Sequence, residues 1–334
     1  MAKAPAKKRS IKEELSIFKE VASARQNSNH SQIFRNIFID LKNKGTRCSP
    51  RGQPVIEIED YSYTLPARVR YCNFESRKLN EEYIKREFLW YLRGNKMDLE
   101  ILQYAKMWGG LVNGDGSINS NYGQYIFAKK QGQKISQFDN VIKTLVEDKD
   151  SRRASISILS RDHLVSSTKD VPCTYSLNFR IRDNKLNMSV HMRSQDAVFG
   201  MGNDAPCFSY IHEMIYVAVR DTAYPDLEMG HYHHTADSFH VYERHFEVME
   251  KIAAGDNYIP IDTPQISTLS EVNFLKTFIH LTYGKPELAP LPKALINAVE
   301  EFPALAEMVE EKIVLSGYNF SGWLTTFKPI TQEK

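Results

Sequence analysis

The chain has 334 residues, of which 42% are hydrophobic and 25% are charged. These ordinary values suit a protein with a buried core and exclude a disordered chain, a collagen-like fibre and a disulfide-stapled miniprotein. A formal net charge of +2 gives no general bias toward nucleic acids or membranes. No apolar run approaches the roughly 20 residues of a membrane span, and no signal peptide opens the sequence. The four cysteines are widely spaced, so we expect free thiols and a soluble, cytoplasmic protein.

The first 28 residues are predicted to be a basic tail followed by a helix. Four basic side chains and no acid occur in the first ten residues, which is typical of a solvated terminus. From Ile11 to about Ala22, apolar residues recur at spacings of three and four, which predicts an amphipathic helix. Residues 27–30 interrupt that pattern.

The next part of the chain alternates loops with helices. Residues 41–54 are rich in glycine, proline and basic side chains, which predicts an exposed loop, and a strand begins at Val55. The apolar stripe in EEYIKREFLWYLRG predicts a helix that ends at Gly94. Residues 109–123 contain five glycines and are predicted as a loop, and residues 138–146 as a short amphipathic helix.

From residue 154 the sequence favours strands. ASISILS, TYSLNFRI and LNMSVHM alternate apolar and polar residues, and Asp183–Asn184 between the last two is a hairpin signal. A helix is predicted from near Pro206 to Val219, a short strand over 239–242 and a helix over 243–254. Helical patterns recur beyond residue 265. The order of elements predicts an α+β fold without repeats.

Cys173 is a candidate nucleophile, because it lies between the polar loop SSTKDVP and an alternating strand. A thiol at such a junction is exposed at one end and held rigidly at the other. Only the thiolate attacks, so nearby cations must favour ionisation, and Arg152, Arg153 and Arg193 are candidates for that role. The alternative is a small buried side chain, which is the commoner fate of a cysteine in a strand. Cys207 is predicted to be a core residue.

Three further features of the sequence have a chemical interpretation. Arginines 51, 152, 153 and 193 carry guanidinium groups that match phosphate oxygens bidentately, although any single one of them favours the alternative of solvated surface charge. Glu87 interrupts the apolar side of its helix, so it is either a half-buried acid with a raised pKa or a salt-bridged structural residue. The run GHYHHT fits no zinc-site spacing, so we interpret its histidines as surface residues and predict no metal.

Six segments together resemble the thymidylate synthase superfamily, and within it the deoxycytidylate hydroxymethylases of bacteriophages. They occur in the family's order with similar spacing and cover about residues 30–255. The segments are REFLWYLRG (86–94), INSNYGQ (118–124), DSRR (150–153), VPCTYS (171–176), MRSQDAVFGMGND (192–204) and HVYERHF (240–246). The resemblance implies a thymidylate synthase-like α+β fold, in which helices flank a large mixed sheet and one sheet face forms a homodimer interface.

The resemblance also implies the catalytic residues. Cys173 matches the nucleophile that adds to C6 of a pyrimidine nucleotide, and Glu87 matches the glutamate that organises water and moves protons at the ring. Tyr122 matches a tyrosine near the nucleophile. The implied co-substrate is 5,10-methylenetetrahydrofolate, with Asp196, Gly200 and Trp108 on the folate side.

The nucleotide contacts follow from the same matches. Arg51, Arg193 and Ser194 correspond to the phosphate-binding residues, although the loop around Arg51 departs from the family's glycine- and threonine-rich pattern. His240 and Tyr242 correspond to contacts with the sugar hydroxyl. Arginines 152 and 153 correspond to the pair that reaches across the homodimer into the partner's site.

Asp204 decides the subclass within the family. Counting Arg193 as one, position twelve is an asparagine that reads uracil in thymidylate synthases, and here it is Asp204, as in the deoxycytidylate hydroxymethylases. Cytosine presents an exocyclic amine where uracil has a carbonyl, and a carboxylate accepts that donor. A protonated Asp204 would in addition donate to N3. The implied reaction therefore converts dCMP to 5-hydroxymethyl-dCMP, in the host cytoplasm if the source is viral.

Alternatives remain open at this stage. Pro172, directly before the cysteine, is the residue expected in a synthase more than in a hydroxymethylase. A register slip of one residue would place Asn203 at the base-reading position and favour uracil. The same motifs would serve a dUMP hydroxymethylase, a thymidylate synthase, a CMP hydroxymethylase or a non-catalytic nucleotide- or RNA-binding regulator. The chain ends in a polar ITQEK rather than a short apolar segment. We therefore divide it into residues 1–28, a catalytic domain over 29–264 and a helical extension over 265–334.

Overall fold

The centre of the protein is a seven-stranded mixed sheet, seen in a computed structural model that describes residues 29–129, 132–261, 265–269 and 271–273. The strand order is β1-β2-β7-β5-β4-β3, and β6 pairs with β7 beside this path. The β5–β7 and β6–β7 pairs are parallel and the other neighbouring pairs are antiparallel. The strands are β1 Thr46–Cys48, β2 Val55–Leu65, β3 Ser155–Ser157, β4 Thr174–Arg182, β5 Lys185–Met192, β6 Gln195–Asp196 and β7 Glu228–Tyr242.

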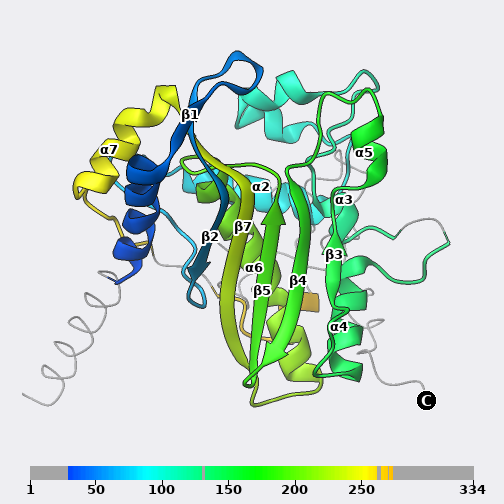
Figure 1. Ribbon diagram of the computed structural model, residues 1–334. Helices are drawn as coiled ribbons and strands as arrows, with labels where there is room; N and C mark the ends of the chain where they lie inside the picture. Colours follow the sequence, from blue (N-terminus) through cyan, green and yellow to red (C-terminus); the bar gives the residue numbers. More distant parts are fainter. Residues whose placement is uncertain (1–28, 130–131, 262–264, 270, 274–334) are drawn as a thin grey trace, which may run out of the picture.

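Helices flank this sheet on one face and at its edges. In Figure 1, α2 and α6 lie behind the sheet, α4 lies beside β3, and no described helix covers the face toward the viewer. The described part of the first helix spans residues 29–44. The other α-helices are α2 Glu81–Arg93, α3 Gly123–Ile126, α4 Gln137–Glu147, α5 Arg161–Val165, α6 Gly200–Thr222 and α7 Phe246–Ala254, and the 3-10 helices are η1 Pro50–Gly52, η2 Glu100–Gln103, η3 Lys106–Leu111 and η4 Glu243–His245. The predicted α+β class is confirmed.

The alternation in the strands explains which face is buried. Leu177, Phe179 and Ile181 of β4 point into the core between sheet and helices. Arg180 and Arg182, which alternate with these residues along the strand, are exposed. Burying such a face removes apolar surface from water, at roughly 25 cal/mol per Å². Within the described ranges, every helix is too short or too polar to cross a lipid bilayer.

Local sequence signals set several boundaries as predicted. The side chain of Asn80 accepts a hydrogen bond from the Tyr83 N–H (3.0 Å) and begins α2, and Gly94 ends it with a left-handed backbone (φ 57°). Asp183 and Asn184 both have positive φ, 49° and 56°, which is the conformation that a tight two-residue hairpin requires.

Five sequence-based expectations were wrong. Residues 29–30 are helical, although a break was predicted there, and the same helix takes in residues 41–44 of the predicted loop. Helix α6 begins six residues before Pro206, which lies inside it. Strand β7 has 15 residues and absorbs GHYHHT, because pairing with β2 and β5 on its two sides satisfies its backbone. Within that run His231 is exposed but His234 is fully buried, so the latter is not a surface residue.

The domain boundaries stay predictions. The basic tail, the helix over 11–22 and residues beyond 273 lie outside the described residues. The part of the predicted extension that is described contacts the end of α6. Arg220 donates to the Ser267 carbonyl oxygen (2.6 Å), and the Asp221 carboxylate accepts from the Leu269 N–H (2.9 Å).

Candidate active site

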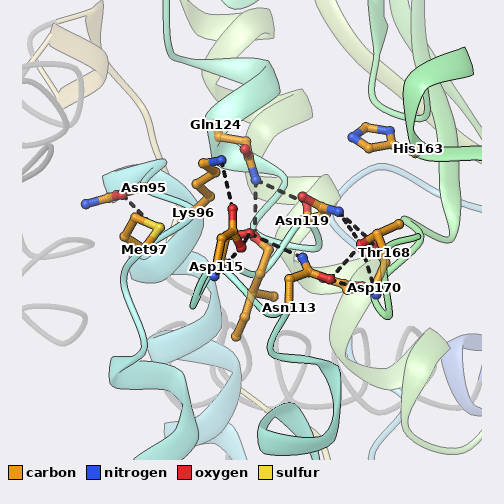
Figure 2. Close-up of polar contacts among 12 residues, drawn as sticks. Asn95, Lys96, Met97, Asn113, Asp115, Asn119, Gln124, His163, Thr168 and Asp170 are labelled. Carbon is orange, nitrogen blue, oxygen red and sulfur yellow. Dashed lines mark hydrogen bonds and ion pairs between the residues drawn. The ribbon is translucent and has the colours of Figure 1, made fainter. Parts of the chain in front are cut away.

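The loop that leads into β4 is held by a network of side-chain hydrogen bonds, shown in Figure 2. Thr168 Oγ1 donates to Asn113 Oδ1 (2.6 Å) and accepts from Asn119 Nδ2 (2.9 Å). The Asp170 carboxylate accepts from both the N–H and the hydroxyl of Ser120, at 2.6 Å each. Fixing the loop in this way sets the position of the residue that follows it, Cys173, at the start of β4.

Cys173 is surrounded by groups that face it directly. Its N–H donates to the hydroxyl of Tyr122 (3.2 Å), and its carbonyl accepts from the Arg193 N–H (2.8 Å). The Arg193 guanidinium donates to the carbonyls of Val171 (2.7 Å) and Pro172 (3.1 Å), and its Nη2 lies 3.4 Å from Cys173 Sγ. The guanidinium is therefore locked beside the sulfur by the backbone of the same loop.

The electrostatics of the thiol are a balance of burial and charge. Burial raises the pKa of Cys173, the Arg193 guanidinium lowers it, and the Asp204 carboxylate raises it again. Arg51, exposed in η1, also acts to lower this thiol pKa. Because the thiolate is the nucleophile, these cations favour the reactive form against the cost of burial.

Arginines 152 and 153 do not reach the thiol within one chain. Both are exposed, and the β3–β4 register places Arg153 level with Arg180, seven residues along β4 from Cys173. At about 3.3 Å per residue, the separation is roughly 23 Å. The expectation that these two arginines lower the pKa of Cys173 in the same chain was therefore wrong.

Glu87 lies on α2 with 3% of its surface exposed, which is deeper than the half-buried position predicted from the sequence. The Tyr91 hydroxyl makes a long hydrogen bond to Oε1 (3.5 Å), and Oε2 is buried with no hydrogen-bond partner among the described residues. Burial, reinforced by the charge of Asp204, raises the pKa of Glu87 to about 8. A carboxyl group with that pKa can take up or release a proton near neutral pH.

Asp204 lies in the second turn of α6, where the earlier start of that helix places it. Burial raises its pKa to about 7, and a hydrogen bond from Gln195 Nε2 to Oδ2 (3.4 Å) opposes the rise. The charge of Asp204 also acts on the pKa values of Cys173, Glu87 and Tyr122. The structure therefore brings together the four side chains predicted as catalytic.

An aromatic stack joins the helices to the strand. Tyr122 is 4% exposed, and its ring stacks on Tyr91 (centroids 5.3 Å apart) and Phe208 (6.0 Å). Its hydroxyl contacts the Cys173 N–H, so the stack connects α2 and α6 to the nucleophile. Burial holds the pKa of Tyr122 far above its usual value, so the phenol stays neutral.

The predicted nucleotide-binding residues occupy the β7 side of the site. His240 is buried, and its ring contacts Tyr242 edge-on, with centroids 5.0 Å apart. The pKa of Tyr242 is raised by burial first and then by Asp196, and lowered by Arg244 and Arg51. Ser194 is half-buried between Arg193 and Gln195. Arg51 adopts a left-handed backbone (φ 54°) in its exposed turn.

The residues assigned to the folate side have clear local partners. Asp196 accepts hydrogen bonds from the N–H groups of Val198 (3.0 Å) and Phe199 (3.1 Å). Gly200 begins α6 immediately afterwards. Trp108 is 8% exposed and donates its Nε1–H to the Tyr83 hydroxyl (3.0 Å).

Sequence reasoning missed three residues that touch this group. Tyr91 lies four positions after Glu87, and that helical spacing is a signal that was available. Gln195 is the variable position of R-S-x-D, and it contacts Asp204. Tyr63 donates to Gln195 Oε1 (3.2 Å) from β2, 132 residues earlier, and nothing in the sequence pattern connects the two.

Comparisons with known proteins agree with this geometry. The thymidylate synthase family profile matches residues 30–278. Deoxycytidylate 5-hydroxymethyltransferase of Enterobacteria phage T4 is 34% identical over 66% of this chain and 88% of its own length, and that of phage T6 is 33% identical over the same shares. Deoxyuridylate hydroxymethyltransferase of Bacillus phage SP01 is 28% identical over 64% of this chain and 57% of its own length. The chain belongs to the thymidylate synthase family.

Proposed function

We propose that this protein converts dCMP to 5-hydroxymethyl-dCMP with 5,10-methylenetetrahydrofolate and water. The coarser statement, a folate-dependent one-carbon transferase, follows from the family and from the hydroxymethyltransferase relatives. The observation that supports the finer one is the position of Asp204, which acts electrostatically on both Cys173 and Glu87.

Asp204 suits a cytosine ring chemically. Its ionised form offers only acceptors, which match the exocyclic amine of cytosine and repel the carbonyl oxygen of uracil. With a pKa of about 7, both protonation states of Asp204 are populated near neutral pH. The protonated acid would donate to N3 of cytosine, so either state has a partner on this base.

The chain's own residues account for the chemistry at the ring. The Cys173 thiolate forms a bond to C6, and the electron pair moves to C5, which becomes the nucleophile. Methylenetetrahydrofolate supplies the one-carbon unit that C5 takes up. Glu87 accepts and returns protons at the ring and orients water, whose oxygen becomes the new hydroxyl group. Loss of the C5 proton expels tetrahydrofolate from the one-carbon unit, and water adds to the methylene group that this leaves on C5. The electron pair returned to C5 then expels the Cys173 sulfur and restores the C5–C6 double bond.

The folate-side residues fit such a ligand. Each oxygen of the Asp196 carboxylate accepts one backbone N–H and keeps a second acceptor position, so Asp196 can hold an N–H-bearing heterocycle. The neighbouring Phe199 ring is 46% exposed, which leaves an aromatic face for stacking. We therefore assign the folate to the start of α6, with Gly200 and Trp108 as further contacts.

The proposal includes a homodimer in which arginines 152 and 153 complete the partner's site. Both are exposed and lie roughly 23 Å from Cys173 along their own sheet, whose outer face no described helix covers (Figure 1). A mixing experiment tests this arrangement. Cys173→Ala protein mixed with an Arg152→Ala, Arg153→Ala variant should regain up to about a quarter of wild-type activity through heterodimers. No recovery after subunit exchange would contradict it.

A second candidate is supported by the deoxyuridylate hydroxymethyltransferase of phage SP01. Incubating the protein with methylenetetrahydrofolate and dCMP, dUMP or CMP, followed by mass spectrometry of the nucleotide, separates the possibilities. We expect one added hydroxymethyl group on dCMP alone. Modification of CMP would indicate a ribonucleotide pathway, and hydroxymethylation or methylation of dUMP would contradict the reading of Asp204. A protein that binds nucleotide without turnover would instead be a regulator.

A matched variant completes this test. Asp204→Asn replaces an acid whose ionised form only accepts with an amide that can always present a donor to uracil, so it should shift preference toward dUMP. Asp196→Asn is the control, because it alters a neighbouring carboxylate outside the proposed base contact. An unchanged dCMP/dUMP ratio in Asp204→Asn would mean that another residue reads the base.

A further inference from the structure

Two buried side chains stand behind Asp204 in a continuous hydrogen-bonded row. Gln195 in β6 is 2% exposed and donates from Nε2 to Asp204 Oδ2 (3.4 Å). The Tyr63 hydroxyl, from β2, donates to Gln195 Oε1 (3.2 Å). The row therefore runs from tyrosine through glutamine to the carboxylate.

The direction of this row is fixed by Tyr63. A side-chain amide has one accepting end and one donating end, so a donor at Oε1 obliges Nε2 to face Asp204. Tyr63 is itself well held, because its ring lies parallel to His234 (centroids 4.9 Å apart, 5° between planes). The Tyr232 hydroxyl and His234 Nδ1 are 2.9 Å apart, which fixes that imidazole in turn. Burial lowers the pKa of His234 to about 3, so the ring is neutral and adds no charge.

An N–H donor on Oδ2 changes what Asp204 offers a base. It stabilises the ionised carboxylate and occupies a lone pair that a proton would otherwise take. The protonated acid does not discriminate, because its O–H can be given to N3 of cytosine or to the carbonyl oxygen of uracil. The carboxylate can only accept, which matches the exocyclic amine of cytosine and repels the carbonyl oxygen of uracil. A donor behind Asp204 thus favours cytosine over uracil.

We propose that Gln195, oriented by Tyr63, is a positioning residue that sets the preference for a cytosine over a uracil ring by keeping Asp204 an acceptor. The inference rests on the proposed function, because it assumes that Asp204 contacts the base. It adds two residues, from β6 and β2, to the determinants of substrate choice. The opposing action of the Gln195 hydrogen bond on the raised pKa of Asp204 agrees with this role.

Three substitutions probe the row at successive points. Gln195→Glu replaces the donor with an acceptor and places a second acid against Asp204. Gln195→Met removes the donor at similar length. Tyr63→Phe keeps the ring against His234 but frees the amide to turn. The matched control is Tyr61→Phe on the same strand, which removes a hydroxyl that donates to Asp40 (3.0 Å).

The measurement is kcat/KM for dCMP and for dUMP between pH 5.5 and 9. We expect the dCMP/dUMP ratio near pH 7 to fall by about tenfold or more in Gln195→Glu, about tenfold in Gln195→Met and about threefold in Tyr63→Phe. The pH at which dCMP and dUMP are used equally should rise in the same order. Tyr61→Phe should match the wild type. Equal losses for both nucleotides with no pH displacement would show a merely structural role and overturn the inference.

The ionisation of Asp204 is read separately. Titration of its carboxyl carbon by NMR in ligand-free protein should show a higher pKa in Gln195→Met than in the wild type, and Asp204→Asn identifies the signal. A wild-type enzyme that does not prefer dCMP contradicts the proposed function while this titration still tests the row. A wild type that prefers dCMP, with ratio and titration unchanged in Gln195→Met and Tyr63→Phe, overturns the inference alone.

Discussion

The site has a strand side and a helix side, and burial acts on the two in opposite ways. On the strand side, Cys173 lies directly before β4, with the Arg193 guanidinium 3.4 Å from its sulfur. On the helix side, Glu87 of α2 and Asp204 of α6 make no ion pair with any described residue. Burial raises the pKa of each of these carboxyl groups. Burial raises pKa values on both sides, yet only one side has a cation.

This difference corresponds to the form in which each group is useful. The thiol must ionise to attack, so burial opposes its function and Arg193 offsets that cost. A carboxyl group that transfers protons works best with a pKa near the operating pH, so burial without a cation suits Glu87. The placement of one guanidinium therefore separates a nucleophile from proton-transfer groups in a single shielded region.

The largest effect is expected from removing the nucleophile. Cys173→Ala leaves no group able to add to C6, so turnover should fall at least about a thousandfold. Steady-state assays by nucleotide mass spectrometry measure the loss. Cys48→Ala, which alters a half-buried thiol in β1 outside the site, is the control and should retain activity. Full turnover by Cys173→Ala would show that Cys173 is not the nucleophile.

The next largest effect concerns the helix side. Glu87→Gln cannot exchange a proton, so kcat should fall about a hundredfold. It should also change the pH dependence of stability. Between pH 4.5 and about 8 the unfolded chain loses this proton and the folded chain keeps it, so the wild type loses stability as the pH rises through that window.

Calorimetry at pH 4.5, 6 and 8.5 measures that contribution. Relative to wild type, Glu87→Gln should gain of the order of 3 kcal/mol in unfolding free energy between the lowest and the highest pH. Glu81→Gln, on the exposed first turn of the same helix, should show no such trend. A constant difference between Glu87→Gln and wild type across the series would show that burial does not perturb this acid.

The two sides meet at Gly123, and a substitution there should disturb both. A Cβ at this position would lie 1.6 Å from the Tyr91 carbonyl oxygen, so α2 and α3 must move apart to admit it. Gly123→Ala should cost about 3 kcal/mol or more in stability and reduce turnover by displacing the adjacent Tyr122. Gly109→Ala, whose Cβ meets no atom within 4 Å, should be nearly neutral in denaturant unfolding. Equal stabilities of the two variants would mean that the contact relaxes freely.

The elements with strong local signals were predictable from the sequence. The apolar stripe and terminal glycine of α2 and the Asp183–Asn184 turn are short-range features, and the structure follows them. Strand β7 was predicted at four residues and has 15, because its partners β2 and β5 supply what its own sequence lacks. Long-range pairing is not encoded in a local window, so this error has a physical cause.

The candidate site likewise contains residues that could be predicted from motifs and supporting contacts that could not. Cys173, Glu87 and Asp204 were proposed from motifs, and the structure places Asp204 within electrostatic reach of both Cys173 and Glu87. Their supporting contacts were not predictable, because they depend on register and crossing strands. Gln195 meets Tyr63 across 132 residues, and Arg193 meets the Cys173 loop only because β4 and β5 pair at Thr174 and Met192.

The smallest expected effect concerns how the Arg193 guanidinium is held beside the Cys173 sulfur. Arg193→Lys keeps a positive charge but loses the planar fork that donates to the carbonyls of Val171 and Pro172, so the charge is no longer locked beside the sulfur. The pKa of the Cys173 thiol should rise, and alkylation by iodoacetamide at pH 8, followed by peptide-resolved mass spectrometry, should slow about threefold to tenfold.

Arg182→Lys is the matched control, because Arg182 also donates to backbone carbonyls but lies at the far end of β4. It should leave the alkylation profile unchanged. If Arg193→Lys titrates like the wild type as well, a nearby positive charge alone is sufficient and the fixed fork is not required. If the thiol pKa is higher in Arg193→Lys, the fixed position of the Arg193 guanidinium is what distinguishes the strand side from the helix side. The variant keeps the positive charge and loses only its attachment to the loop.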